Sequence, residues 1–266
     1  MKVYFVDSFT TEKFKGNPAA VCFPESDADP QEDRMQKIAF EIGFSETAFV
    51  RHLEGDTYSI RFFTPKKEIP LCGHATLAAA KVIFENRAVE TITFQNREHV
   101  RLPIARKERR IVMEFPVYDT QDVVVPPALT AALGIDQLVC ARLSPRNGII
   151  LLEMEDPARL ARLQPDFQAL VNSHSGINGV LLTARSRNPN YDFEYRYFWP
   201  WAGTNEDPVT GGVQTFLTRY WAEILHKNTL RAFQSSFRTG SMVTELRRDK
   251  VLIYGEAVIV LEGTLR

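Results

Sequence analysis

The chain has 266 residues, 32 basic and 33 acidic, and a formal net charge of −1 at neutral pH. This balance gives no electrostatic reason to bind nucleic acid or an anionic membrane. Its three cysteines are too few and too scattered for a disulfide framework or a zinc site, and no apolar run approaches the length of a membrane span. From these features we expect no nucleic-acid, membrane or metal partner. A strand pattern begins at once, without a signal peptide, so we expect a cytoplasmic protein.

The first half of the chain alternates short strand patterns with two helices. Asp29-Pro30 is a strong helix start, and apolar residues at helical spacing continue to Gly43, which we expect to end the helix. A second helix, residues 73–85, is apolar nearly all round and contains three consecutive alanines, so we expect it to be buried. The predicted strands are residues 3–6, 19–23, 44–51, 58–63, 92–94, 99–104 and 111–115.

The second half repeats this plan more loosely. A helix after Pro126 is expected to stop at Gly134, and a longer helix to cover residues 211–225. Short helices are predicted to open at Asp156-Pro157 and Pro165-Asp166. The predicted strands are residues 138–143, 148–153, 177–184 and 191–199, with further strands up to residues 258–261.

One short motif occurs twice, about half a chain length apart. Arg61-Phe62-Phe63-Thr64-Pro65 is matched by Arg196-Tyr197-Phe198-Trp199-Pro200, and each copy is followed by a glycine that opens a helix pattern. Such a repeat indicates a duplicated half. Strands that follow strands through short turns disfavour an all-parallel sheet. We therefore predict an α+β fold of two pseudo-symmetric domains, each a mixed, mostly antiparallel sheet curled around a central helix.

The predicted boundary between the halves is the proline-rich stretch at residues 116–127. We expect an N-terminal half at residues 1–117 and a C-terminal half at residues 118–266. The final strand, near residues 257–266, is able to pack back onto the first half.

Both repeated helix starts carry polar residues beside glycine. Cys72-Gly73-His74 precedes the first helix, and Glu206-Asp207 followed by Gly211-Gly212 precedes the second. Free N–H groups and the helix dipole favour an anion there, so a small carboxylate can be held between two such starts. The simpler interpretation is structural: a glycine-containing cap, a buried Cys72, and Asp207 as an N-cap.

Glu46 interrupts the apolar strand pattern that surrounds it. A carboxylate that faces a poorly hydrated cleft can serve as both acid and base. Alternation leaves its direction open, because Ala48 and Val50 lie on the same side of the strand as Glu46.

Six spaced motifs of the sequence agree with one known family. They are Asp7-Ser8-Phe9-Thr10, Gly16-Asn17-Pro18-Ala19-Ala20-Val21, Ser45-Glu46-Thr47-Ala48-Phe49, Phe63-Thr64-Pro65 with Glu68, Cys72-Gly73-His74-Ala75-Thr76, and Glu206-Asp207-Pro208-Val209-Thr210-Gly211. In this order they resemble the PhzF family, the phenazine biosynthesis-like isomerases, which share the diaminopimelate epimerase fold. The resemblance runs from residue 1 to about residue 220.

The resemblance implies a cofactor-free site in the cleft between the two domains, where a small carboxylate-bearing metabolite binds, and a homodimeric protein. Glu46 would be the proton-transferring carboxylate, with His74 and Asp207 as its polar neighbours. The backbones at Gly73 and at the glycine pair would hold the substrate carboxylate. The implied substrate-binding residues are Asn17, Cys72, Gly73, Gly211 and Gly212.

The sequence departs from the family pattern near the second helix start. The family usually has Gly-Ser where this chain has Gly211-Gly212, so a hydroxyl contact to the substrate is missing. Residues 234–240 match the family's C-terminal pattern only loosely, and Trp199 and Trp201 add unusual bulk. These departures bear on the substrate more than on the fold.

Three functions remain open from the sequence. The first is a cofactor-independent isomerase that shifts a proton on a small carboxylate-bearing substrate. The second is a non-catalytic binding or interaction protein on the same fold. The third is a two-thiol racemase or epimerase, which needs a cysteine at each helix start, whereas only Cys72 is so placed. No nucleotide loop, metal-ligand cluster or Schiff-base lysine motif is present, so we expect no cofactor.

Overall fold

The computed structural model describes residues 1–24 and 31–266, and the predicted helix start at Asp29-Pro30 lies outside these ranges. The chain forms two compact units, one of residues Met1–Phe115 with Leu252–Arg266 and one of Pro116–Val251. The predicted second half, residues 118–266, differs from this division in its last segment. That segment belongs to the first unit, where strand β18 (Ala257–Thr264) pairs with β1 (Lys2–Ser8).

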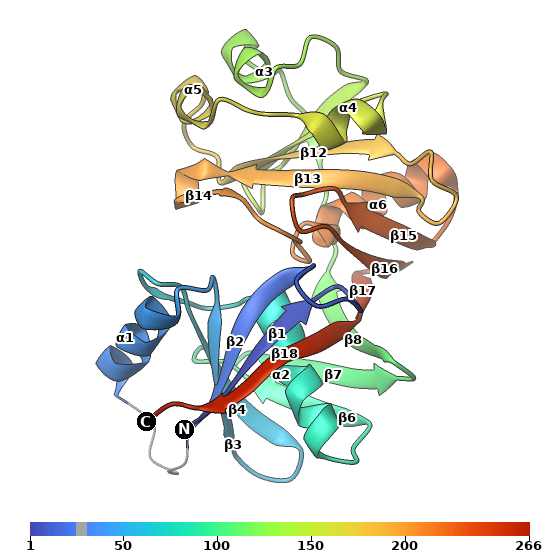
Figure 1. Cartoon of the computed structure of the whole chain (residues 1–266). Coiled ribbons are helices and arrows are strands. Elements are labelled where there is room, and N and C mark those ends of the chain that lie inside the picture. The colour runs from blue at the N-terminus through green and yellow to red at the C-terminus, as the bar shows by residue number, and fades with distance from the viewer. Residues whose placement is uncertain (25–30) are drawn as a thin grey trace. The chain divides into compact units, whose positions relative to one another are not determined.

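The first unit is a mixed sheet in which most neighbouring strands are antiparallel (Figure 1). Only the β2–β3 and β4–β6 pairs are parallel among the strand pairs recorded in this unit. Its other strands are β2 (Asn17–Phe23), β3 (Thr47–His52), β4 (Thr57–Phe63), β5 (Glu68–Ile69), β6 (Thr91–Gln95), β7 (Arg101–Lys107), β8 (Arg110–Pro116) and the end of β17 (Lys250–Gly255).

The helix predicted at residues 73–85 is α2 (Gly73–Asn86), and it is buried over most of its length. It contacts β1, β2, β3 and β18, so the sheet curls around it. The alanines at positions 78–80 are fully buried, and their small side chains let the strands approach the helix closely. Helix α1 (Glu32–Ile42) packs on β3 and β4 and ends at Gly43, whose φ of 76° is left-handed as predicted for a helix stop.

The second unit repeats this arrangement. Helix α6 (Gln214–Leu225) contacts β15 and β16, and its Trp221 stacks on Phe193 of β13 with ring centroids 5.6 Å apart. The strands are β9 (Gln121–Asp122), β10 (Cys140–Ser144), β11 (Ile149–Glu153), β12 (Gly179–Arg185), β13 (Phe193–Trp199), β14 (Thr204–Glu206), β15 (Thr229–Gln234) and β16 (Gly240–Arg247). The short helices are α3 (Pro127–Leu133), α4 (Pro157–Arg162), α5 (Phe167–Ser173) and the 3-10 turn η1 (Pro200–Ala202).

The two units share one order of strand pairing. In the first unit the pairs β2–β3, β3–β4, β4–β6 and β6–β7 are in turn parallel, antiparallel, parallel and antiparallel. In the second unit the pairs β11–β12, β12–β13, β13–β15 and β15–β16 follow the same order. This repetition confirms the predicted α+β fold of two pseudo-symmetric domains. No helix among the described residues is both long enough and apolar enough to span a membrane.

One predicted helix start is wrong. The helix expected from residue 211 begins at Gln214, and Gly211, Gly212 and Val213 form a turn before it. Two adjacent glycines lose more conformational entropy than other residues on entering a helix, which explains the later start.

Candidate functional site

Glu46 lies immediately before β3 with its side chain buried, at 4% exposure. Its backbone carbonyl accepts a hydrogen bond from the Ala20 N–H at 3.1 Å, which ties this residue to β2. Its carboxylate oxygen Oε2 accepts a hydrogen bond from the Cys72 thiol at 2.7 Å and lies 3.4 Å from Nε2 of His74. The direction that alternation left open is therefore inward.

His74 stands in the first turn of α2 and is held on two sides. Its carbonyl accepts a hydrogen bond from the Ser8 hydroxyl at 2.8 Å, and its Nδ1 lies 3.1 Å from the amide nitrogen Nδ2 of Asn17. Because an amide N–H can only donate, Nδ1 accepts in this arrangement, and the proton of the neutral ring sits on Nε2, facing Glu46. Asn17 therefore orients the imidazole toward the carboxylate.

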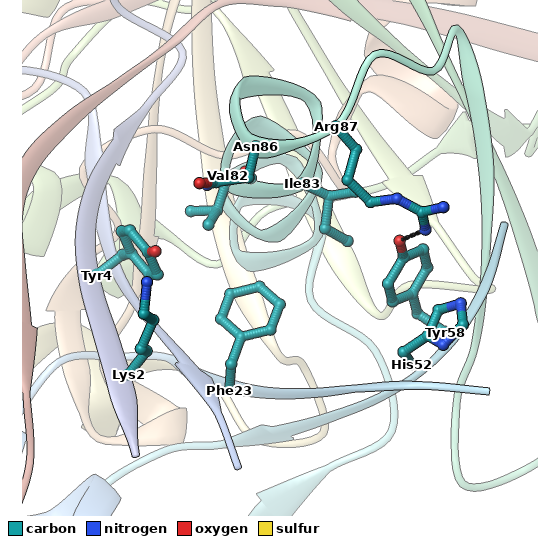
Figure 2. A pocket seen from close by; sticks show the side chains of 9 residues that line it. All are labelled: Lys2, Tyr4, Phe23, His52, Tyr58, Val82, Ile83, Asn86 and Arg87. Atoms are coloured by element: carbon teal, nitrogen blue, oxygen red, sulfur yellow. Dashed lines mark hydrogen bonds between the residues drawn. The ribbon is translucent and has the colours of Figure 1, made fainter. Parts of the chain in front are cut away.

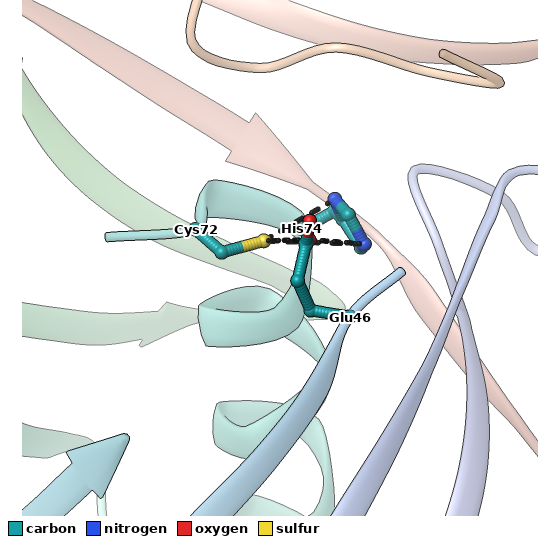
Figure 3. A group of neighbouring side chains, drawn as sticks. All are labelled: Glu46, Cys72 and His74. Atoms are coloured by element: carbon teal, nitrogen blue, oxygen red, sulfur yellow. Dashed lines mark hydrogen bonds and ion pairs between the residues drawn. The ribbon is translucent and has the colours of Figure 1, made fainter. Parts of the chain in front are cut away.

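Cys72 is the residue that precedes α2, and it is 8% exposed. Its carbonyl accepts the Thr76 N–H at 3.1 Å, the first bond of the helix, while its sulfur lies 3.4 Å from Nδ1 of His74. Figure 3 shows the side chains of Glu46, Cys72 and His74 converging on one point. Burial raises the pKa of the Cys22 thiol, which is not part of this group, to about 12, so that sulfur stays protonated.

The start of α2 adds a positive field to this group. The N–H groups of Gly73, His74 and Ala75 come before that of Thr76, the first N–H that donates within the helix, so they point out of the helix. Together with the helix dipole they favour an anion near His74. The site thus combines a buried carboxylate, an oriented imidazole, a thiol and an anion-favouring helix end.

The residues predicted from the second repeat lie in the second unit. Asp207 accepts a hydrogen bond from the Thr210 hydroxyl and lies half-buried before α6. Burial is the larger cause of the raised pKa of the Tyr197 hydroxyl, and the negative charge of Asp207 raises this pKa further. Asp207 is therefore not the N-cap of α6, because that helix begins seven residues later at Gln214.

Gln234 is a residue that sequence reasoning identified only loosely. Its side-chain N–H donates to the Asp207 carbonyl at 2.5 Å, and its side-chain oxygen accepts the Thr210 N–H at 2.7 Å. The Tyr195 hydroxyl donates to the Thr210 carbonyl at 3.0 Å. These bonds fix the loop that carries Asp207, and the only sequence signal was the weak motif at residues 234–240.

Gly211 and Gly212 follow this fixed loop. Gly211 is buried and Gly212 is exposed. A Cβ built on Gly212 meets no atom of the described residues within 4 Å, so the serine that the family usually carries has room here. That Asp207 and this glycine pair join Glu46 in one site stays a prediction.

A separate hollow of about 480 Å³ lies at the other end of α2, beside Val82 and Ile83 (Figure 2). Tyr4, Phe23 and Tyr58 form its aromatic walls. None of the described residues that line it is a carboxylate, so it offers no equivalent of Glu46. The candidate site is therefore the group around Glu46 at the start of α2.

Comparison with known proteins agrees with the motifs. The family model described as phenazine biosynthesis-like protein (PhzC-PhzF) matches residues 6–263. A relative from Halalkalibacterium halodurans, named an uncharacterized isomerase, is 40% identical over 99% of this chain and 97% of its own length. The crystal structure of a PhzF family protein from Enterococcus faecalis superposes with a TM-score of 0.91 at 38% identity, covering 98% of this chain and 97% of that one. A predicted epimerase from Pseudomonas aeruginosa shares the fold, with a TM-score of 0.72 at 20% identity over 99% of this chain and 98% of that one.

Proposed function

Since the chain belongs to the PhzC-PhzF family of phenazine biosynthesis-like proteins, we propose that it is an isomerase that moves a proton on a small carboxylate-bearing substrate. Glu46 removes the proton from one carbon and returns it to another. The hydrogen-bonded position of Glu46 beside His74 and Cys72, at the start of α2, is the observation that carries this proposal.

The chemistry requires a base within reach and a means to stabilise charge. A carbon-bound proton leaves slowly unless a positioned side chain accepts it while the developing negative charge is stabilised. The backbone N–H groups of α2 can stabilise such a charge, but they cannot accept a proton. Of the side chains at the start of α2, Glu46 is the carboxylate, so the role of base falls to it.

The neighbouring residues take supporting roles in this proposal. His74, oriented by Asn17, donates through Nε2 to Glu46 or to the substrate. The N–H groups at Gly73 bind the substrate carboxylate, as helix starts bind anions. Asp207, Gly211 and Gly212 are the predicted contribution of the second unit. Cofactor independence, a homodimer and a cytoplasmic location also stay predictions.

A two-thiol mechanism is less well supported. It needs a second cysteine at the start of α6, and residues 207–214 contain none. Cys140 is placed in β10, where its sulfur lies 3.0 Å from the Tyr220 hydroxyl.

The test is entry of solvent deuterium into a C–H position during incubation with a panel of small mono- and dicarboxylates. Glu46→Gln keeps the side-chain shape and removes the base, so we expect exchange to be abolished while the melting temperature stays nearly unchanged. Glu41→Gln, on the exposed face of α1, is the matched control and should exchange at the wild-type rate. Equal exchange in both variants would overturn the assignment of Glu46 and make Asp207 the next base to test.

A further inference from the structure

The side chains of Glu46, Cys72 and His74 offer three kinds of metal ligand at one point. A carboxylate oxygen, a sulfur and a ring nitrogen all lie within 4.8 Å of one another, and all three side chains are buried (Figure 3). Thiolate, imidazole and carboxylate are the ligands from which zinc sites are built. A site with three protein ligands leaves the fourth position to water or to a small ligand.

The distances between the three atoms are close to those of a tetrahedral site. With the usual bond lengths to zinc, ligand atoms lie about 3.3 to 3.6 Å apart. Oε2 of Glu46 lies 3.4 Å from Nε2 of His74, and Nε2 lies 3.9 Å from the Cys72 sulfur. The 2.7 Å between sulfur and Oε2 is a hydrogen-bond distance, so it has to lengthen once the thiol proton is replaced by a cation.

The surroundings also suit a metal-bound imidazole. A histidine that ligates through one nitrogen commonly donates the other N–H to an oxygen. The Asn17 amide lies 3.1 Å from Nδ1 of His74, and a half-turn of that amide would present its oxygen to an Nδ1–H. The start of α2 favours negative charge close to Cys72. One thiolate and one carboxylate together balance the charge of a divalent cation.

We propose that Glu46, Cys72 and His74 form a binding site for a zinc-class divalent cation. Sulfur, Nε2 and Oε2 each donate an electron pair to the ion. The ring proton of His74 moves from Nε2 to Nδ1, and the thiol proton passes to the solvent buffer. The ion binds the carboxylate oxygen that the proposed isomerase uses as its base. The ion therefore acts as an inhibitor and not as a cofactor. Metal binding itself does not depend on the proposed function, because it needs no substrate.

The test is titration of metal-stripped protein with Zn²⁺ by calorimetry and with Co²⁺ by absorption spectroscopy. We expect one site per chain and a near-ultraviolet sulfur-to-cobalt charge-transfer band. Loss of even an outer partner of a metal ligand lowers affinity by about 10- to 100-fold, so Cys72→Ser should weaken binding by more than about 100-fold and remove the band. Cys140→Ser, which changes a cysteine in the second unit, is the control and should keep both.

Several results would overturn the proposal. One is the absence of a cobalt band in the wild-type protein. The others are unchanged binding in Cys72→Ser and an equal loss of the band in Cys140→Ser. His74→Gln provides a second variant should Cys72→Ser fail to fold, and circular dichroism identifies that case. Deuterium exchange without metal binding would overturn this proposal alone, and metal binding without exchange would overturn the proposed function alone.

Discussion

The guanidinium of Arg61 and the carboxylate of Glu68 form a two-point ion pair in which Nε and Nη2 each lie 2.7 Å from a different oxygen. In the second unit Arg196 and Glu206 form the same pair, with the same two distances. Arg61 and Arg196 are the first residues of the repeated motif, so the duplication extends from sequence letters to side-chain contacts. Each pair joins a strand to the short strand that leads toward the next helix.

The Arg196–Glu206 pair should matter more for stability than the Arg61–Glu68 pair. The Arg196 side chain is 7% exposed, and its Nη1 also donates to the Leu163 carbonyl at 2.8 Å. Removing one partner of a buried pair costs about 3–5 kcal/mol, because the other charge is left buried. We therefore expect Arg196→Met to lower the free energy of unfolding by about 3 kcal/mol or more in urea titrations.

The control for this prediction is an exposed pair. Arg219 pairs with Glu223 on the surface of α6, and such pairs contribute about 0–1 kcal/mol, so Arg219→Met should change little. An equal loss of stability in both variants would contradict the buried-pair argument.

Glu68 should make the first unit sensitive to acid. Burial, the largest single cause, would raise the pKa of this carboxyl, but the hydrogen bonds and positive charges of Arg61 and Arg97 together hold the pKa below its usual range. A carboxyl with a lowered folded-state pKa contributes stability that is present above its unfolded-state pKa and is lost as the pH falls through the folded-state pKa. We expect Glu68→Gln to be less stable than wild type at neutral pH and to lose less stability between neutral and acid pH, measured by urea unfolding at several pH values. Parallel stability curves for the two proteins would contradict this linkage.

The sequence predicted the fold because the repeat, the helix stops and the all-apolar helix are local patterns. The left-handed stops at Gly43 and Gly134 and the buried α2 are confirmed. Strand alternation left the direction of Glu46 open, because this residue lies just before β3 and its contact with Cys72 joins residues far apart in the sequence. Only the resemblance to the family pointed to an inward side chain. The role of Gln234 was hidden for the same reason, since it acts on Asp207 and Thr210 from a later strand.

Gly212→Ser should restore the hydroxyl that the family usually carries without harming the fold. A Cβ at this position meets no described atom within 4 Å, and exposed substitutions of this kind usually change stability by no more than about 0.5 kcal/mol. If the second unit contributes to substrate binding as predicted, the variant should bind the substrate more tightly, measured as a lower KM in the exchange assay. An unchanged KM with an unchanged melting temperature would argue that this position does not contact the substrate.

Gly16 contrasts with Gly212, because a side chain at Gly16 would collide with the backbone. Gly16 has a φ of 68°, and a Cβ there would lie 2.1 Å from the Ser8 carbonyl oxygen. Gly16→Ala should therefore destabilise the first unit strongly and displace Asn17 from His74. The comparison separates an open glycine from one that the backbone requires.

Cys72→Ala tests whether sulfur takes part in the chemistry or only holds Glu46. The thiol donates a hydrogen bond to Oε2 of Glu46, and a bond to a charged group is worth about 1.5–3 kcal/mol, which corresponds to a rate loss of about 10- to 100-fold. We expect the deuterium exchange rate to fall within that range or less, since Glu46 and His74 remain in place. A loss of more than about 1000-fold with the fold intact would indicate that the sulfur itself carries the proton. The pH profile of the exchange rate distinguishes the two cases. If the thiol only positions Glu46, the profile follows the ionisation of the carboxylate. If the thiolate itself reacts, the profile follows the ionisation of the thiol.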